Sequence, residues 1–508
     1  MTGAGAVRVV AIDQGTTGTR CVVFDGAGRP RAFAYAEHRQ SAPRPGWLEH
    51  DPEEIWTATA RVVADAMAQA APPRPAVAAV GITNQRETVV VWDRRTGRPV
   101  YPAIVWQDTR TRDACEALIR DGAAETIRSR TGLPVATYFS ATKLAWILDE
   151  VPGARSRAER GDLCAGTIDA WLIWRLTGGP DGGAHVTDPT NASRTMLMDL
   201  RTRAWDPELL DLLHVPPAVL PEIRSSSERY GVTRRDGPLG EAVAVCGALG
   251  DQQAALVGQA CYRPGDAKNT YGTGCFLLQH TGAEPARSGA GLVSTVAYAF
   301  PSQAAYALEG SIAIAGAAVQ WLRDDLGIIR AAEETAGLAA SVPDTGGAYF
   351  VPAFSGLFAP YWDMTARGAI VGLTRYVTRA HLVRATLEAI CYQTRDVVDA
   401  MQRDTGLRLA ALRADGGASR NDVLMQMQAD LLGLPVVRAS IGETTALGAA
   451  YAAGLSAGVW ESLEAAGRSW AADRTFEPAM PAVEREERYA GWRRAVERAR
   501  GWAGEASS

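Results

Sequence analysis

Lysine is nearly absent from the sequence. Of its 52 lysine and arginine residues, only two, Lys143 and Lys268, are lysines. We attribute this skew to the base composition of a GC-rich genome rather than to function. It still has a chemical consequence, because a P-loop needs a phosphate-binding lysine in a GxxxxGK[ST] motif, and the sequence contains no such motif. A mechanism that needs a phosphate-binding lysine therefore has very few candidate residues.

Cysteine is also sparse and shows no pattern. The seven cysteines are scattered and form no CxxC pair, which argues against a disulfide framework or a zinc site and for reduced thiols. The N-terminus lacks the charged-then-apolar pattern of a signal peptide. The least polar long stretch, residues 444–460, is shorter than a membrane-spanning helix needs. We therefore expect a cytoplasmic protein without membrane insertion.

Charge of one sign does not dominate the chain. Its formal net charge is -5, with 47% hydrophobic and 21% charged residues, which is typical of a globular protein. This balance provides no basic field for nucleic acid and no polybasic signal for an anionic membrane. At 508 residues the chain is too long for one hydrophobic core, so two domains are expected.

A short hairpin near the N-terminus is the most informative stretch. Residues 7–10 form a β-branched run that predicts a buried strand, and residues 21–24 predict its partner. The turn between them is rich in glycine and threonine, which offer close backbone approach and hydroxyl donors to an anion. Asp13 can hold a hydrated Mg²⁺ there, and Arg20 can reach a phosphoryl oxygen. An ordinary hairpin closed by glycine and threonine explains this stretch equally well.

A second hairpin of the same design follows half a chain later. Residues 268–278 predict a strand, a turn containing Gly272, Thr273 and Gly274, and a second strand. The pair of hairpins predicts two related domains facing each other across a cleft, each donating backbone N–H groups to a nucleotide's phosphates. In residues 409–421 a strand runs into a double glycine and then a helix, which suits close approach to an adenosine or α-phosphate.

Several helices carry clear boundary signals. Asp51 predicts an N-cap, and the proline-rich residues 72–75 end that helix. Ser140 predicts the N-cap of a second helix. Helices are also predicted over residues 311–325 and 378–403.

Adjacent Arg86 and Glu87 follow a buried strand and mark a second candidate site. Arginine supplies only hydrogen-bond donors and ionised glutamate only acceptors, which suits two vicinal hydroxyls. A solvated surface ion pair is the alternative if the dipeptide stands alone. Asp251 follows the strand at 243–249 and is explained equally well as a first-turn helix acid.

These motifs together resemble the FGGY carbohydrate kinases, and within that family the members that phosphorylate glycerol. The resemblance covers essentially the whole chain. It rests on residues 13–20, 84–88, 250–253, 271–276 and 415–417, with two longer patterns at 138–147 and 368–388.

The resemblance implies an α/β protein with two RNase H-like (actin-like ATPase) domains, residues 1–257 and 258–508, and an interdomain catalytic cleft. It implies transfer of a phosphoryl group from ATP to glycerol, giving sn-glycerol 3-phosphate, with Mg²⁺ as cofactor, as the first step of glycerol breakdown. It also implies a homodimer or homotetramer.

The resemblance assigns roles to individual residues. The positions that hold the hydroxyls of glycerol are Arg86, Glu87, Tyr138, Asp251 and Gln252, and the aromatics that pack on its carbon chain are Trp106 and Phe276. The nucleotide contacts are Thr16, Thr17, Gly18 and Arg20 in the first phosphate loop, Thr273 in the second, and Gly316, Gln320, Gly417 and Asn421 beyond them. The acids close to the metal are Asp13 and Asp251.

The general base is expected to be Asp251. A primary alcohol is a poor nucleophile, so a carboxylate within hydrogen-bond reach of its hydroxyl is the natural base. Phosphoryl transfer passes through a loose transition state, so the base needs no strongly raised pKa.

Two alternatives stay open. A kinase of the same superfamily that acts on another small polyol or ketose would share the phosphate loops, although the spacing of Arg86 and Glu87 fits a three-carbon triol. A non-catalytic actin-like ATP-binding protein would keep both hairpins and need no polyol pocket.

Two controls that operate in relatives are not expected in this chain. Regulated bacterial relatives carry a basic, glycine-rich loop for sugar-bisphosphate inhibition, but residues 232–242 contain an acid and no basic residue in their second half. Other relatives are activated by phosphorylation of a histidine, and none lies between His214 and His280.

Overall fold

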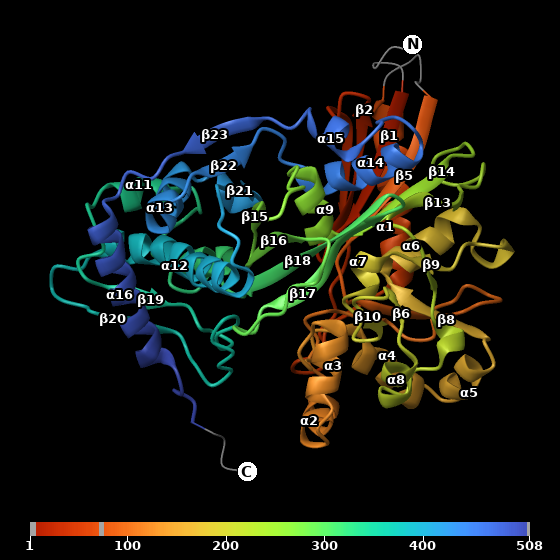
Figure 1. The fold of residues 1–508 in the computed structure, drawn as a ribbon, viewed down its shortest axis with the longest axis horizontal. Helices are drawn as coiled ribbons and strands as arrows, with labels where there is room; N and C mark the ends of the chain where they lie inside the picture. The colour runs from red at the N-terminus through yellow and green to blue at the C-terminus, as the bar shows by residue number, and fades with distance from the viewer. Residues whose placement is uncertain (1–6, 71–75, 505–508) are drawn as a thin grey trace.

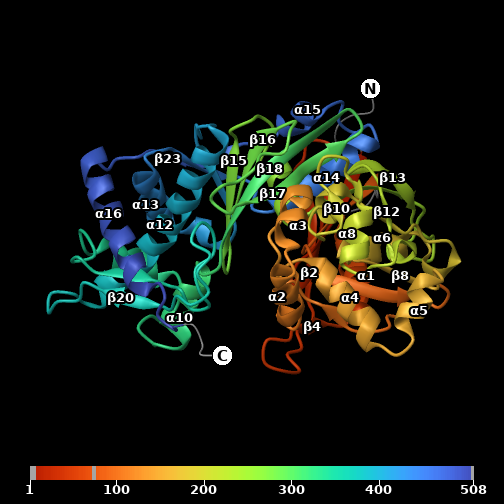
Figure 2. The same cartoon turned by 60° about the horizontal axis from the view of Figure 1, so that its bottom comes forward.

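The computed structural model describes residues 7–70 and 76–504, which form two lobes, each built on a mixed β-sheet (Figures 1 and 2). The predicted helix breaker at 72–75 lies outside the described residues. The first sheet has the strand order β13-β14-β5-β1-β2-β3. Its strands are β1 (Val7–Gln14), β2 (Gly18–Asp25), β3 (Pro30–Glu37), β5 (Ala76–Asn84), β13 (Ser227–Val232) and β14 (Ala244–Gly250).

The second sheet has the order β17-β18-β16-β15-β21-β22-β23. Its strands are β15 (Ala267–Tyr271), β16 (Cys275–Gly282), β17 (Val293–Phe300), β18 (Gln303–Ile312), β21 (Leu412–Asp415), β22 (Val436–Ala439) and β23 (Ala472–Phe476).

The two sheets repeat one topology. In the first, β3, β2 and β1 are antiparallel neighbours, β1, β5 and β14 are parallel, and β13 closes the edge antiparallel. In the second, β18, β16 and β15 are antiparallel, β15, β21 and β22 are parallel, and β23 closes the edge antiparallel. The predicted pair of related α/β domains is confirmed, and β17 is an addition to the second.

Smaller sheets complete the lobes. One has the order β4-β7-β6-β8, with β4 (Glu49–His50), β6 (Val89–Asp93), β7 (Ala103–Ile104) and β8 (Leu163–Thr167). The others are two-stranded: β9 (Val186–Thr187) with β12 (Glu222–Ile223), β10 (Met198–Asp199) with β11 (Ala204–Trp205), and β19 (Tyr349–Val351) with β20 (Ala369–Val371).

Helices cover the sheets. Those that precede the second sheet are α1 (Pro52–Gln69), α2 (Arg112–Arg120), α3 (Ala124–Thr131), α4 (Ser140–Glu150), α5 (Ala154–Glu159), α6 (Ile168–Thr177), α7 (Pro189–Ala192), α8 (Pro207–Leu212) and α9 (Asp251–Gly258). The later ones are α10 (Gly316–Asp324), α11 (Glu334–Ala340), α12 (Arg379–Thr405), α13 (Asp422–Leu432), α14 (Thr444–Ser456), α15 (Leu463–Gly467) and α16 (Ala482–Ala499). Short 3-10 turns are η1 (Gly179–Asp181), η2 (Pro217–Val219) and η3 (Gly417–Arg420). No helix in the described ranges is long and apolar enough to cross a membrane.

Helix boundaries test the capping arguments. Asp51 is the N-cap of α1, and its carboxylate accepts from the backbone N–H of Glu53 at 2.9 Å, as predicted. Ser140 is not an N-cap, however: Phe139 occupies that position, and Ser140 is the first residue of α4. The Ser140 hydroxyl donates instead to the backbone carbonyl of Glu87 at 3.0 Å, because α4 begins against the turn after β5.

The helix predicted over residues 311–325 begins later than expected. Ser311 and Ile312 complete β18, where they pair with Phe276 and Cys275 of β16. Helix α10 starts only at Gly316. The sheet register overrides the helical pattern there, because the ladder bonds to β16 are made before the chain turns.

Helix α14 returns from the second half of the chain to the first lobe. In Figure 1 this blue helix lies against the red strands β1 and β5, and its alanines form one buried cluster with residues of β1, β14 and α9. Four glycines permit the approach: a Cβ on Gly81, Gly247, Gly258 or Gly448 would collide with backbone of the facing element. Helices α9 and α14 can therefore approach this closely only because glycine has no side chain at the crossing.

We predict that Gly448→Ala lowers the free energy of unfolding by about 1–3 kcal/mol or more, because the added methyl meets the backbone of Ala254 and the helices must separate. Urea denaturation checks this. Gly337→Ala, in α11, is the matched control, because nothing lies within 4 Å of its added Cβ. Equal stability of the two variants would contradict the prediction.

Candidate active site

The candidate residues lie where the parallel strands of the first lobe end. Gln14 of β1 and Gly250 of β14 both pair with Asn84 of β5, so the three strands stop at the same edge. Ligands bind at this edge in open α/β sheets. Arg86 lies two residues after β5 and Asp251 directly follows β14, and Arg86 reaches Glu309 of the second lobe.

Four buried charges form a closed ring across the lobes. Both Nη atoms of Arg86 donate to Glu309, one of them at 3.1 Å from Oε1. The same Oε1 accepts from Arg194 Nη2 at 2.9 Å, and Arg194 Nε donates to Glu87 Oε1 at 2.6 Å. Glu87 Oε1 lies 3.9 Å from Arg86 Nε, which closes the ring. All four side chains are at most 2% exposed, and their charges sum to zero.

Burial and the neighbouring arginines shift the pKa values of the two acids of the ring in opposite directions. Burial alone favours the neutral form of Glu309, but Arg194 and Arg86 hold its pKa at about 2. Burial raises the pKa of Glu87, against the opposing effect of Arg194 and Arg86. Because each carboxylate touches two guanidinium groups, the position of Arg86 is fixed from both lobes.

Asp251 is the acid of this group that faces open space. Arg86 Nε lies 3.1 Å from Asp251 Oδ1. The Asp251 side chain is 29% exposed, whereas that of Arg86 is 2% exposed. Asp251 is the first residue of α9, with Gly250 as N-cap. A carboxylate held at one oxygen by a guanidinium keeps its other oxygen for a ligand.

Three aromatic side chains border the same space. The Trp106 ring lies edge-on to the rings of Tyr138 and Phe276, with centroids 5.5 and 6.3 Å away. Its indole Nε1 donates to Thr16 Oγ1 at 3.0 Å. The guanidinium of Arg194 lies 5.7 Å from the Tyr138 ring. The aromatic wall therefore joins the charged ring to the first glycine–threonine turn.

That turn carries the acid predicted for a metal. Burial raises the pKa of Asp13 to about 7, Arg20 opposes this, and Asp251 and Glu443 reinforce it. Arg20 Nε lies 3.6 Å from Asp13 and its Nη1 lies 3.0 Å from Glu443 of the α14 N-cap. The buried carboxylate of Asp13 is costly to ionise, and Asp251 is close enough to raise its pKa further. These two acids fit Mg²⁺ held through one or two carboxylates and substrate phosphates.

The rest of the first turn has the predicted shape. The backbone N–H of Gly15 donates to the carbonyl of Gly18 at 2.9 Å, so Thr16 and Thr17 form its tip. Thr17 is exposed. A Cβ on Gly18 would collide with Tyr35 and the backbone of Ala36, so this strand start needs glycine.

The second turn meets the start of α10. Gly316 N donates to the carbonyl of Gly272 at 3.0 Å, and Ala317 N donates to that of Thr273 at 3.0 Å. A Cβ on Gly316 would lie 2.6 Å from the carbonyl oxygen of Gly272. Gln320, one turn further along α10, is exposed.

The double-glycine turn lies beside this hairpin. A Cβ on Gly416 would lie 2.5 Å from the carbonyl oxygen of Tyr271, so the two backbones touch. Gly417 is exposed. Asn421 Oδ1 caps α13, accepting from two backbone N–H groups, and its Nδ2 donates to Thr335 at 3.1 Å. The side chain of Asn421 thus has partners within the protein.

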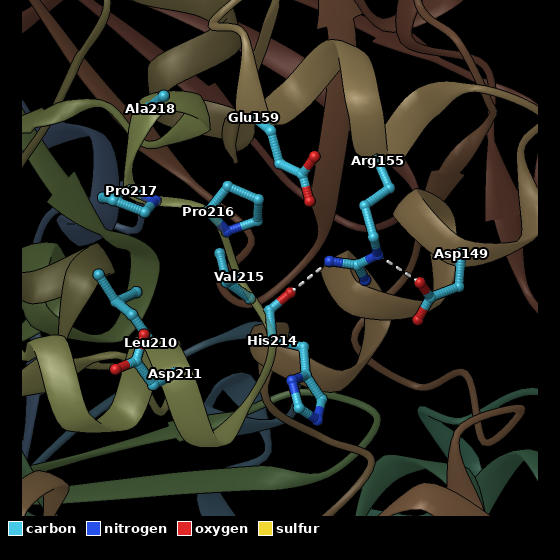
Figure 3. Close-up of a pocket in the computed structure, with 10 residues that line it drawn as sticks. All are labelled: Asp149, Arg155, Glu159, Leu210, Asp211, His214, Val215, Pro216, Pro217 and Ala218. Atoms are coloured by element: carbon cyan, nitrogen blue, oxygen red, sulfur yellow. Dashed lines mark hydrogen bonds and ion pairs between the residues drawn. The ribbon is translucent and has the colours of Figure 1, made fainter.

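A surface hollow of about 640 Å³ lies elsewhere, between α5, α8 and residues 216–218. Figure 3 shows Arg155 reaching across it, donating to Asp149 at 2.5 Å and to the backbone carbonyl of His214 at 2.8 Å. No predicted site residue lines it. The hollow is separate from the candidate site.

The structure therefore brings Arg86, Glu87, Tyr138 and Asp251 into one neighbourhood, and it adds residues that the sequence did not reveal. Arg194 lies two residues after α7, and no motif in the sequence marks it. Glu309 carried a signal that was missed, because it is a charged residue in the middle of an apolar strand. Lys268, from β15, also belongs to this group: its Nζ lies 2.5 Å from Gln252 Oε1.

Comparison with known proteins defines the class. The models of the N-terminal and C-terminal domains of the FGGY family of carbohydrate kinases match residues 8–258 and 267–457. The chain belongs to this family.

Several relatives that are similar to this chain over nearly its full length are glycerol kinases. Glycerol kinase of Methylorubrum populi is 59% identical over 98% of this chain and 99% of its own length. That of Mycobacterium tuberculosis is 58% identical, covering 97% and 96%. The crystal structure of Plasmodium falciparum glycerol kinase with ADP has a TM-score of 0.91 at 37% identity, covering 97% of this chain and 98% of that one.

We predict that Glu309→Gln lowers the free energy of unfolding by about 3–5 kcal/mol, because it leaves two buried guanidinium groups facing one carboxylate. Urea denaturation measures this. The double variant Arg194→Met with Glu309→Gln restores charge balance and should recover part of the loss. If the free energy of unfolding of Glu309→Gln lies within about 1 kcal/mol of the wild-type value, the ring has no special role in stability, because ordinary substitutions cost about that much.

Proposed function

We propose that the chain phosphorylates glycerol at the expense of ATP, giving sn-glycerol 3-phosphate and ADP. The observation that carries the proposal is the position of Arg86, which contacts Glu87 and Asp251 at once beneath an aromatic wall. Donors and acceptors alternate along these three side chains, as two neighbouring hydroxyls require. The relatives named above support the same substrate.

Asp251 is the proposed general base. The free carboxylate oxygen of Asp251 accepts the proton of the terminal hydroxyl of glycerol. The hydroxyl oxygen bonds to the γ-phosphorus as the bond from that phosphorus to the β–γ bridging oxygen breaks. The bridging oxygen leaves with ADP. Arg86 holds the carboxylate in place through Nε. Positioning and charge neutralisation supply most of the rate in such a loose transition state.

The two turns are proposed to hold the nucleotide. Thr16, Thr17, Gly18 and Arg20 approach its phosphates from the first lobe and Thr273 from the second, with Gly316, Gln320, Gly417 and Asn421 towards the nucleoside. Asp13, with Asp251 beside it, would hold Mg²⁺, which neutralises phosphate charge when bound.

A coupled assay of ADP release across glycerol, dihydroxyacetone, erythritol and xylulose tests the proposal. We expect the highest kcat/KM with glycerol. Faster turnover of xylulose or erythritol would favour a kinase for another polyol or ketose. Nucleotide binding without turnover of any of the four would favour a non-catalytic ATP-binding protein.

We predict that Asp251→Asn lowers kcat by on the order of 10²-fold or more with a modest change in the glycerol KM, because it keeps the shape of the side chain and removes the base. Steady-state kinetics measures this. Asp113→Asn, an exposed first-turn acid of α2, is the matched control for a purely helix-capping role. Similar kinetics in both variants would refute the assignment of the base.

A further inference from the structure

The chain's two lysines are both buried at the candidate polyol pocket. Lys143 and Lys268 are each 0% exposed. Lys143 lies on α4 in the first lobe and Lys268 on β15 in the second, 125 positions apart. A skew in base composition explains why lysine is rare elsewhere, but it does not explain why both remaining lysines lie at this pocket.

Lys268 holds two predicted substrate contacts. Its Nζ lies 2.5 Å from Gln252 Oε1, 2.9 Å from Thr270 Oγ1 and 3.2 Å from the backbone carbonyl of Phe276. Because the amide oxygen of Gln252 is occupied, its NH₂ group is left to donate towards a ligand. The contact with the Phe276 carbonyl fixes the strand that carries one aromatic of the wall.

Lys143 holds the backbone around Tyr138, a predicted substrate contact of the first lobe. Its Nζ lies 2.5, 2.9 and 3.1 Å from the backbone carbonyls of Thr137, Tyr138 and Phe139. Three successive carbonyls therefore converge on one ammonium. This contact sets the path of the backbone that presents Tyr138 to the pocket.

The geometry needs an ammonium rather than a guanidinium. A lysine ammonium is a compact point charge with three donors, whereas a guanidinium is planar and suits flat, paired acceptors. Each Nζ meets three oxygens at one point. Within residues 7–70 and 76–504, neither ammonium has a carboxylate within ion-pair distance. A buried charge without an ion pair is costly, so the three converging oxygens are what stabilises each ammonium here.

We infer that Lys143 and Lys268 are positioning residues of the polyol pocket, one in each lobe: each gathers three oxygens and thereby fixes Tyr138, or Gln252 and Phe276, for a small polyhydroxylated substrate. The inference rests on the proposed function.

Variants of Lys268 separate charge from geometry. We expect Lys268→Met to raise the glycerol KM by roughly 10- to 100-fold, as for loss of charged hydrogen bonds, with the ATP KM within about twofold. Lys268→Arg keeps the charge and should fail to restore the KM. Arg395→Met, which removes a buried cation bound to Glu486 in the second lobe, is the matched control and should keep the wild-type glycerol KM.

The wild-type protein gives a test that does not depend on folding of a variant. Because the chain has only two lysines, labelling with lysine carrying ¹⁵N at Nζ yields two side-chain ammonium resonances. We expect both to exchange slowly with water and both to shift when glycerol is added. A resonance that stays in place at saturating glycerol overturns the inference for that lysine.

The outcomes distinguish the two proposals. A wild type that phosphorylates glycerol, with a folded Lys268→Met or Lys268→Arg variant whose glycerol KM is unchanged, overturns the role of Lys268 and leaves the proposed function intact. A wild type without glycerol turnover and without glycerol-dependent shifts removes both.

Discussion

The ring of Arg86, Glu87, Arg194 and Glu309 is the constraint on which the site depends. Each member is buried, and a single unpaired charge there would cost several kcal/mol. The ring can therefore close only when β18 of the second lobe lies against the turn that follows β5 of the first. The same four side chains therefore join the two lobes and lie at the candidate site.

The ring also ties the polyol pocket to the nucleotide side. Glu309 pairs with Leu278 of β16, and three residues further along β18 Ile312 pairs with Cys275, beside the second glycine–threonine turn. Glu309 and that turn are therefore carried by the same pair of strands, three residues apart. The candidate polyol residue Arg86 and the second glycine–threonine turn are thus linked through one sheet.

The strand ends and turns could be predicted from local sequence. The ring of four buried charges could not. The hairpins at Asp13 and Thr273 follow from β-branched runs and glycine–threonine turns, and β1, β2, β15 and β16 are confirmed. Glu309 meets Arg86 across 223 positions and Arg194 across 115. Nothing in a single sequence fixes such pairings, since they depend on how two separately folded sheets face each other. The late start of α10 has a different cause, the register of β18 with β16 within the second sheet.

The repeated topology makes the differences between the lobes interpretable. The penultimate pair of the first hairpin is Asp13 with Arg20, whereas that of the second is Thr270 with Phe276. One scaffold therefore presents a charged pair on one side of the seam and an uncharged pair on the other. Under the proposed function, the charged pair would lie on the side of the metal and the transferring phosphoryl group, whose charges must be neutralised. The two hairpins therefore share one topology but present different side chains to the candidate site between the lobes.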